Sequence, residues 1–223
     1  MRVPGRLSCL SCLSCLIIVD VQNDFLPGGA LAVARGDEVV AVANALMPAF
    51  GRVIATQDWH PRAHGSFAAQ HAGRSVGEVV ELGGVDQVLW PVHCVQDSPG
   101  ASFAPGLELG GIDHVVQKGM DPRVDSYSGF FDNDRQRATG LAALLGEHGE
   151  TEVWVMGLAT DYCVKATALD ALRLGFAVTL LVDGCRAVDL QAGDGAQAIA
   201  EMQAAGVVLR TSGEVLAAAP GPR

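Results

Sequence analysis

The sequence predicts a single α/β domain in which a doubly wound, mostly parallel six-stranded sheet has helices on both faces. Short β-branched apolar runs alternate with amphipathic stretches along most of the chain. The apolar runs are continuous, as in parallel strands that are buried on both faces. The 223 residues are 49% hydrophobic, which supplies one sizeable core without disulfide or metal cross-links.

The expected elements follow one another in chain order. Strands are expected at residues 16–19, 52–56, 114–117, 152–156, 177–182 and 207–210. Helices are expected at residues 37–50, 135–148, 160–174 and 193–205. Gly175 ends the third of these helices, as a C-terminal glycine does. Residues 65–111 show no clear period, and a loop of that length inside a compact domain is usually functional.

The two ends of the chain lie outside this pattern. Residues 1–15 are interpreted as an irregular extension, residues 16–212 as the folded domain, and residues 213–223 as a tail; Ser-Cys-Leu occurs three times, at residues 8–10, 11–13 and 14–16. The alternative for the first 19 residues is a signal peptide, because a basic start precedes an apolar run. That run is too short to span a membrane and lacks a small-x-small cleavage site, so a buried strand is the better interpretation.

Composition excludes several classes of partner. Lys and Arg number 15 against 25 Asp and Glu, which gives a net charge of −10. Nucleic acids and anionic membranes attract basic proteins, so we expect neither as a partner. The six cysteines show no zinc-finger spacing, and reduced thiols in a cytoplasm are the expected state.

Chemically reactive side chains follow the expected strands. In an open parallel sheet, ligands bind outside the carboxyl ends of the strands. The residues at these ends include Asp20, Asp58 with His60, Lys118 and Cys163. We therefore expect acid, imidazole, amine and thiol groups to share one edge of the sheet.

Cys163 is the candidate nucleophile. It lies in the first turn of an expected helix, where free N–H groups and the positive helix end favour a thiolate, lower its pKa and can bind an oxyanion. The alternative is a small buried hydrophobe, which is the common role of a free cysteine. Cys94 and Cys185 are interpreted as packing residues.

Asp20 and Lys118 are the candidate base and cation. A carboxylate at a dry strand end can hold a raised pKa and exchange protons, although Asp20 could instead cap a turn. An ammonium at the end of the neighbouring strand would stabilise a thiolate, although Lys118 could instead be solvated.

Asp58 and His60 have the spacing of a metal-binding pair. Side chains at i and i+2 of an extended segment share a face, and His93 could supply a third ligand. Two histidines and one carboxylate suit Zn, Fe or Mn and leave positions open for catalysis. His64 is a further candidate ligand. The alternative is a surface aspartate beside a hydrogen-bonded histidine.

Taken together, these pieces resemble the nicotinamidase branch of the isochorismatase-like cysteine hydrolases. The matching stretches, in family order, are IVDVQNDFLPGGAL at 18–31, QDWHP at 57–61, HGSF at 64–67, WPVHCV at 90–95, KG at 118–119, YSGF at 127–130 and GLATDYCV at 157–164. Each stretch is weak alone, but the ordered set is specific and covers residues 16–212.

The resemblance implies a role for each matching position. The catalytic triad would be Asp20, Lys118 and Cys163, and the N–H groups of Ala159 and Cys163 would form an oxyanion hole after a cis peptide bond at Leu158. The binding residues would be the metal ligands Asp58, His60 and His93, the further candidate His64, and the pocket residues Phe25, Trp90 and Tyr127. Phe25 and Trp90 would sandwich a pyridine ring.

The resemblance also implies a reaction. A cytoplasmic, metal-assisted enzyme with one divalent Zn, Fe or Mn ion would hydrolyse nicotinamide to nicotinate and ammonia through a thioester, with pyrazinamide as a second substrate, in the salvage of NAD. Isochorismatases proper generally lack the cysteine, and related carbamoyl-amide hydrolases lack the metal trio. A non-catalytic family member is a second candidate, and a thiol redox protein that uses the Ser-Cys-Leu run is a third. Whether the chain forms a homo-oligomer stays open.

Overall fold

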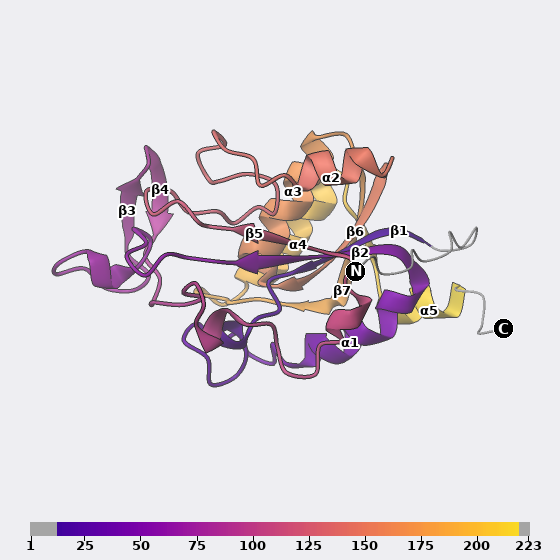
Figure 1. Ribbon diagram of the computed structural model, residues 1–223, viewed down its shortest axis with the longest axis horizontal. Coiled ribbons are helices and arrows are strands. Elements are labelled where there is room, and N and C mark those ends of the chain that lie inside the picture. The colour runs from indigo at the N-terminus through magenta and orange to yellow at the C-terminus, as the bar shows by residue number, and fades with distance from the viewer. Residues whose placement is uncertain (1–12, 219–223) are drawn as a thin grey trace, which may run out of the picture.

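Every strand of the main sheet runs parallel to its neighbours. The computed structural model describes residues 13–218, and the sheet has the strand order β5-β2-β1-β6-β7-β8 (Figure 1). The strands are β1 (Leu13–Val19), β2 (Phe50–Asp58), β5 (His114–Lys118), β6 (Glu152–Leu158), β7 (Ala177–Arg186) and β8 (Val208–Arg210). The expected six-stranded α/β fold is confirmed.

The first strand lies at the centre of the sheet because its side chains are apolar on both faces. Residues 16–19 are fully buried, and Ile17 pairs in register with Ile54 of β2 and Val155 of β6. A continuous apolar run of this kind is stable only where helices cover both faces of the sheet.

Helices cover both faces of the sheet. They are α1 (Glu38–Leu46), α2 (Leu141–Glu147), α3 (Lys165–Arg173), α4 (Asp194–Ala205) and α5 (Ser212–Ala218). In Figure 1, α1 and α5 lie on one side of the sheet, and α2, α3 and α4 lie on the other. From β1 the chain moves through β2 to β5 at one edge of the sheet, and from β6 it moves through β7 to β8 at the other edge. Because crossovers between parallel strands are right-handed, the connecting helices of the two halves lie on opposite faces of the sheet.

The chain ends differ from the sequence expectation. Strand β1 begins at Leu13, so Cys15, assigned to the extension, is a buried residue of the sheet that pairs with Arg52 and Val153. The neighbouring strands β2 and β6 also extend to this end of the sheet, so β1 stays paired with them as far as Cys15. The rest of the expected extension lies outside the described residues. The expected tail contains α5, whose Val215 is buried.

Two interior segments also differ from expectation. The expected helix at 135–148 begins only at Leu141, because Arg135 and Gly140 both have left-handed backbone conformations that a helix cannot include. The aperiodic stretch 65–111 contains a small antiparallel hairpin of β3 (Val79–Leu82) and β4 (Val85–Val88). The hairpin projects beyond the carboxyl edge of the sheet in Figure 1.

Among residues 13–218, no helix combines the length and the apolar character that a membrane crossing requires. The four cysteines in this part of the chain, Cys15, Cys94, Cys163 and Cys185, are free thiols.

The order of the strands creates a switch point between β1 and β6. The chain leaves β1 toward one edge of the sheet and leaves β6 toward the other. In open α/β sheets the loops diverge at such a point and leave a crevice outside the carboxyl ends of the strands. Asp20 follows β1 at this point, and Cys163 follows β6.

Candidate active site

Asp20, Lys118 and Cys163 meet in one buried cluster at the switch point. The Nζ atom of Lys118 lies 2.9 Å from Oδ2 of Asp20 and 3.4 Å from Sγ of Cys163. The carboxylate of Asp20 and the sulfur of Cys163 lie within 4.8 Å of each other. None of the three side chains is more than 7% exposed. The structure therefore brings together the acid, the amine and the thiol that the strand ends predicted.

Thr56 of β2 fixes the orientation of Asp20. The Thr56 hydroxyl donates a hydrogen bond to Oδ1 of Asp20 at 2.7 Å, and the Asp20 N–H donates to the same hydroxyl oxygen at 3.2 Å. Asp20 itself has a left-handed backbone with φ +49°, which turns the chain sharply out of the sheet. With one oxygen held by Thr56, the other oxygen faces Lys118.

Lys118 is a fully buried cation between carboxylates. Its ammonium contacts Asp20 and Asp58 and donates to the carbonyl oxygen of Ser126 at 2.8 Å. Burial alone would lower the pKa of Lys118, but the charges of Asp20 and Asp58 outweigh it and raise the pKa well above its ordinary value. Lys118 therefore remains charged at neutral pH.

At neutral pH, Cys163 is a protonated thiol and Asp20 is an ionised carboxylate. Burial raises the pKa of Cys163 well above its ordinary value, and Lys118 offsets this only in part. The expectation that the helix start lowers this pKa is therefore wrong for the resting site. Burial also raises the pKa of Asp20 to about 6, against the opposing charge of Lys118. The resting site at neutral pH thus pairs a thiol with a carboxylate able to accept its proton.

The turn after β6 places the Cys163 amide at the start of a helix. The peptide bond between Leu158 and Ala159 is cis, as the resemblance implies. A π-helical turn, Thr160–Val164, follows and leads into α3, and its hydrogen bond from the Val164 N–H to the Ala159 carbonyl measures 3.0 Å. The amide of Cys163 lies in this first helical turn, in the part of a helix whose N–H groups can serve a ligand.

Gly157 allows this turn to lie against β1. It has φ +121°, and a β-carbon there would collide with the main chain of Val19. Glycine is therefore required for the close approach of β6 to β1 at the carboxyl edge.

A cavity lined by aromatic and acidic side chains opens onto Cys163. Its lining residues are Phe25, Leu31, Asp58, Trp90, His93, Asp125, Tyr127, Ala159, Tyr162, Cys163 and Val188. The three pocket residues named from the resemblance are all among them. The hydroxyl oxygen of Tyr127 accepts hydrogen bonds from Nε1 of Trp90 at 3.0 Å and from Gln87 at 2.8 Å, which fixes both aromatic rings.

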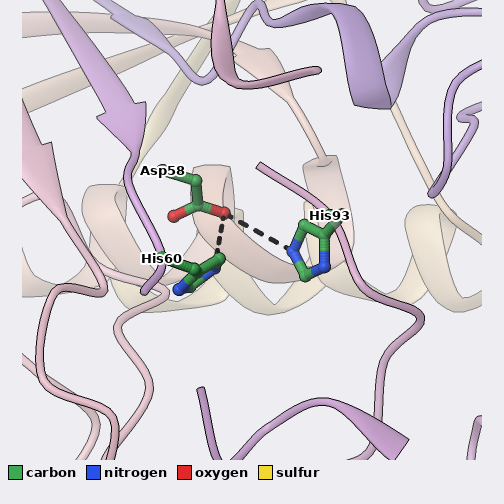
Figure 2. Close-up of side chains that lie close together, drawn as sticks. All are labelled: Asp58, His60 and His93. Atoms are coloured by element: carbon green, nitrogen blue, oxygen red, sulfur yellow. Dashed lines mark ion pairs between the residues drawn. The ribbon is translucent and has the colours of Figure 1, made fainter. Parts of the chain in front are cut away.

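Asp58, His60 and His93 form a second buried group beside this cavity. Figure 2 shows one carboxylate oxygen of Asp58 facing both imidazole rings. This Oδ2 atom lies 3.6 Å from Nε2 of His60 and 3.9 Å from Nε2 of His93. The structure thus brings together the three residues whose types and spacing predicted a metal site.

The histidines are held in the orientation that metal ligands need. Each has its Nδ1 in a hydrogen bond: His60 with the Gly119 carbonyl at 2.9 Å, and His93 with the Pro91 carbonyl at 2.8 Å. This contact fixes the ring and leaves Nε2 facing the group. Burial lowers the pKa of His93 to about 4, so its Nε2 keeps a free electron pair at neutral pH.

His64, next to His60 but outside the Asp58 group, has a buried ring nitrogen that an ion or its bound water could satisfy. Its Nδ1 contacts the Ser66 hydroxyl at 2.7 Å, while its Nε2 is buried with no hydrogen-bond partner within residues 13–218. The His64 ring lies 4.4 Å from the His60 ring, centroid to centroid. A buried nitrogen without a partner is costly, and an ion or its bound water would satisfy it. His64 groups with His60 and Asp125, whereas the set of two imidazoles and one carboxylate at Asp58, His60 and His93 fits Zn, Fe or Mn.

The comparison with known proteins agrees with this geometry. A family model described as the isochorismatase domain matches residues 14–214. The chain belongs to the isochorismatase family. The nicotinamidase of Escherichia coli (strain K12) is 53% identical to this family member over 200 residues, which cover 88% of this chain and 93% of the relative.

Solved structures of family members resemble the whole domain. A nicotinamidase and pyrazinamidase from Acinetobacter baumanii superimposes with a TM-score of 0.88 at 44% identity and covers 91% of this chain and 97% of its own. A pyrazinamidase from Pyrococcus horikoshii, solved in complex with zinc, has a TM-score of 0.72 at 36% identity, with coverage of 89% and 98%. The sequence prediction of the family and fold is confirmed.

Several residues of this isochorismatase-family site were missed from the sequence. Asp125 is buried on the cavity wall, with Oδ1 4.0 Å from Nε2 of His60. Tyr162 packs edge-on against Trp90 with ring centroids 4.8 Å apart. Tyr162 lies within the matched stretch 157–164, beside Cys163, and Asp125 lies just before the stretch 127–130, so the residues in and next to these stretches were the signal that could have found them.

Proposed function

We propose that this protein is a nicotinamidase that hydrolyses nicotinamide to nicotinate and ammonia and also accepts pyrazinamide. The observation that carries the proposal is the convergence of Asp20, Lys118 and Cys163 beside the Asp58 group, at the wall of one aromatic cavity. Membership of the isochorismatase family and the similarity to named nicotinamidases support it. The nicotinate formed would serve the salvage of NAD in the cytoplasm.

The cavity suits a flat aromatic amide. Phe25 and Trp90 would hold the pyridine ring between them, with Tyr127 beside it. Rings bind well in pockets lined by aromatic side chains that a few polar groups orient. The substrate amide would then lie toward Cys163, which carries the only thiol among the described residues that line the cavity.

One divalent ion, Zn, Fe or Mn, would be held by Asp58, His60 and His93, and His64, whose ligand atom lies near those of His60 and Asp125, is a further candidate. Such an ion would supply a Lewis-acidic point that binds the ring nitrogen, directly or through water. The carboxylate of Asp58 is available as a ligand: burial would raise its pKa, but the neighbouring charge of Lys118 is the main effect that offsets this, and the pKa is lowered.

The first half of the reaction forms a thioester. Asp20 accepts the proton of Cys163, and the charge of Lys118 stabilises the resulting thiolate. The sulfur attacks the amide carbon, and the N–H groups of Ala159 and Cys163 bind the oxyanion. The intermediate collapses with cleavage of the C–N bond, and Asp20 returns the proton to the departing ammonia.

The second half releases nicotinate. Asp20, again a carboxylate, accepts a proton from a water molecule as that water attacks the thioester carbon. The same N–H groups bind the second oxyanion. Cleavage of the C–S bond gives nicotinate, and the proton on Asp20 returns to the sulfur of Cys163.

An ammonia-release assay tests the proposal. Purified protein is supplied with nicotinamide, pyrazinamide or a carbamoyl amide as the sole substrate, and the acid product is identified by chromatography. We expect nicotinate and ammonia in equal amounts from nicotinamide. Ammonia from the carbamoyl amide alone, or from none of the three, would contradict the proposal and favour a sister hydrolase or a non-catalytic member.

The Asp58→Ala variant is expected to bind zinc more weakly by roughly 100-fold or more, since even changes behind the ligands cost about 10- to 100-fold. The variant removes the only oxygen ligand of the trio. Zinc affinity is measured on metal-free protein by competition with a chelator. Asp170→Ala is the matched control, because Asp170, which lies on α3, is equally buried but pairs with Arg135 and Arg173. Wild-type zinc affinity in Asp58→Ala would count against the site.

A further inference from the structure

We infer that Gln22 and Asp24 are positioning residues that hold the main chain of the two segments carrying Asp58 and His93. Neither residue faces the metal group as a candidate ligand, and neither lines the cavity. Both lie in the loop that starts at Asp20, and both reach across to other segments with their side chains. The inference rests on the proposed function, because it assigns these residues to the metal site of that enzyme.

Gln22 holds the main chain of Asp58 on both sides. Its side-chain oxygen accepts a hydrogen bond from the Asp58 N–H at 2.8 Å, and its side-chain nitrogen donates to the Asp58 carbonyl at 2.8 Å. The same nitrogen donates to the Ala101 carbonyl at 2.9 Å. Gln22 is fully buried, so both amide hydrogens and the oxygen are used without water. The amide thus continues the pairing of β2 past the end of the neighbouring strand β1.

Asp24 holds the main chain next to His93. Its Oδ2 accepts a hydrogen bond from the Cys94 N–H at 2.7 Å. Cys94 has a left-handed backbone with φ +44°, and its carbonyl accepts from the His60 N–H at 2.9 Å. Cys94 thus links two parts of the site. Its N–H is held by the carboxylate of Asp24, and its carbonyl is bonded to the main chain of His60, a histidine of the metal group.

The packing around Asp24 leaves its carboxylate little freedom. A β-carbon at residue 100 would collide with this carboxylate, so glycine is the residue type that fits beside it at Gly100. The Ala30 N–H also donates to Oδ1 of Asp24, at 3.3 Å. Both oxygens are therefore committed to main-chain groups, which suits a structural role and leaves none for a ligand.

These contacts connect the base to the metal group through one short loop. Asp20 begins the loop, Gln22 binds the segment that carries Asp58, and Asp24 binds the segment that carries His93. Loss of the Gln22 amide would leave the Asp58 N–H and carbonyl unpaired in a buried site, and the segment would shift to satisfy them. A ligand set must hold its geometry closely to bind an ion tightly, so such a shift weakens binding.

The test is zinc binding to metal-free protein by the variants Gln22→Met and Asp24→Ala. Methionine keeps the length of glutamine but has no amide. We expect each variant to bind zinc about 10- to 100-fold more weakly than wild type, and excess zinc to restore most of the lost kcat/KM. Asp24→Asn should recover much of the affinity lost in Asp24→Ala, because its side-chain oxygen can still accept from the Cys94 N–H.

Gln57→Met is the matched control. Gln57 is also buried and donates to the same Ala101 carbonyl at 2.9 Å, but it makes no side-chain bond to Asp58. We expect Gln57→Met to lose thermal stability as Gln22→Met does, yet to keep wild-type zinc affinity. If Gln22→Met does not fold, the inference is tested by zinc affinity in the two Asp24 variants alone: a loss in Asp24→Ala with recovery in Asp24→Asn supports it, and wild-type affinity in Asp24→Ala refutes it.

Three outcomes would overturn the inference, and those that refute only the positioning role can be told apart from the one that also refutes the proposed function. Wild-type zinc affinity in both Gln22→Met and Asp24→Ala, or an equal loss in Gln57→Met, would refute the positioning role while the enzyme itself stands. A wild-type protein that neither binds zinc nor hydrolyses nicotinamide would refute the proposed function together with the inference.

Discussion

The Cys163→Ala variant is expected to lose nicotinamide hydrolysis by about 10⁴-fold or more, because no other side chain on the cavity wall can form the thioester. The substitution removes one buried sulfur and leaves Asp20, Lys118 and the Asp58 group in place. Zinc and nicotinamide affinity should therefore stay near the wild-type values. Single-turnover kinetics gives the rate, and calorimetric titration of the variant gives the ligand affinity.

Cys185→Ala is the matched control for this prediction. Cys185 is a buried thiol at the end of β7 that donates to the Leu181 carbonyl at 3.3 Å and does not line the cavity. The same atoms are removed in both variants, so a general effect of losing a buried sulfur appears in both. Turnover retained in Cys163→Ala, or lost equally in Cys185→Ala, would exclude Cys163 as the nucleophile.

The positions of the reactive side chains were predictable because strand ends are a strong constraint. A parallel sheet brings all carboxyl ends to one edge, so Asp20, Asp58, Lys118 and the turn before Cys163 had to lie there once the strands were assigned. The apolar strands are short and clearly bounded, and their order in space follows from few rules. This part of the site is a consequence of topology.

Residues in irregular loops were not predictable by the same reasoning. Asp125 reaches the cavity from the segment between β5 and α2, and its place depends on the path of that loop. Gln22 and Asp24 lie in a matched stretch, but their partners at Asp58 and Cys94 are 36 and 70 residues away in the chain. No periodicity in the sequence indicates such contacts.

The protonation state of Cys163 shows a second limit of sequence reasoning. The start of a helix is visible in the sequence, and by itself it lowers the pKa of a thiol. Burial beside the carboxylates of Asp20 and Asp58 is a property of the assembled fold, and it raises the pKa instead. The structure therefore assigns more of the work of deprotonation to Asp20 than the sequence did.

Replacing Asp20 by asparagine should lower kcat/KM by about 10²- to 10⁴-fold, the usual contribution of a general base. Asparagine keeps the shape of the side chain and an oxygen that can accept from Thr56, but it cannot accept the proton of Cys163. Alkylation of Cys163 by iodoacetamide should slow as well, because the thiol then lacks its proton acceptor. Asp113→Asn is the control, since Asp113 accepts from the Val53 N–H outside the site.

The pH profile of the wild-type enzyme supplies an independent check on the same role. The active form needs Asp20 as a carboxylate, and its pKa is raised to about 6 by burial. Activity should therefore be full above this value and fall as the pH drops through about 6, with zinc content measured at each pH to separate proton uptake from metal loss. An activity profile that stays flat down to the ordinary pKa of an aspartate would remove Asp20 from the mechanism. Wild-type alkylation and turnover in Asp20→Asn would do the same, and would leave Cys163 without its proposed proton acceptor.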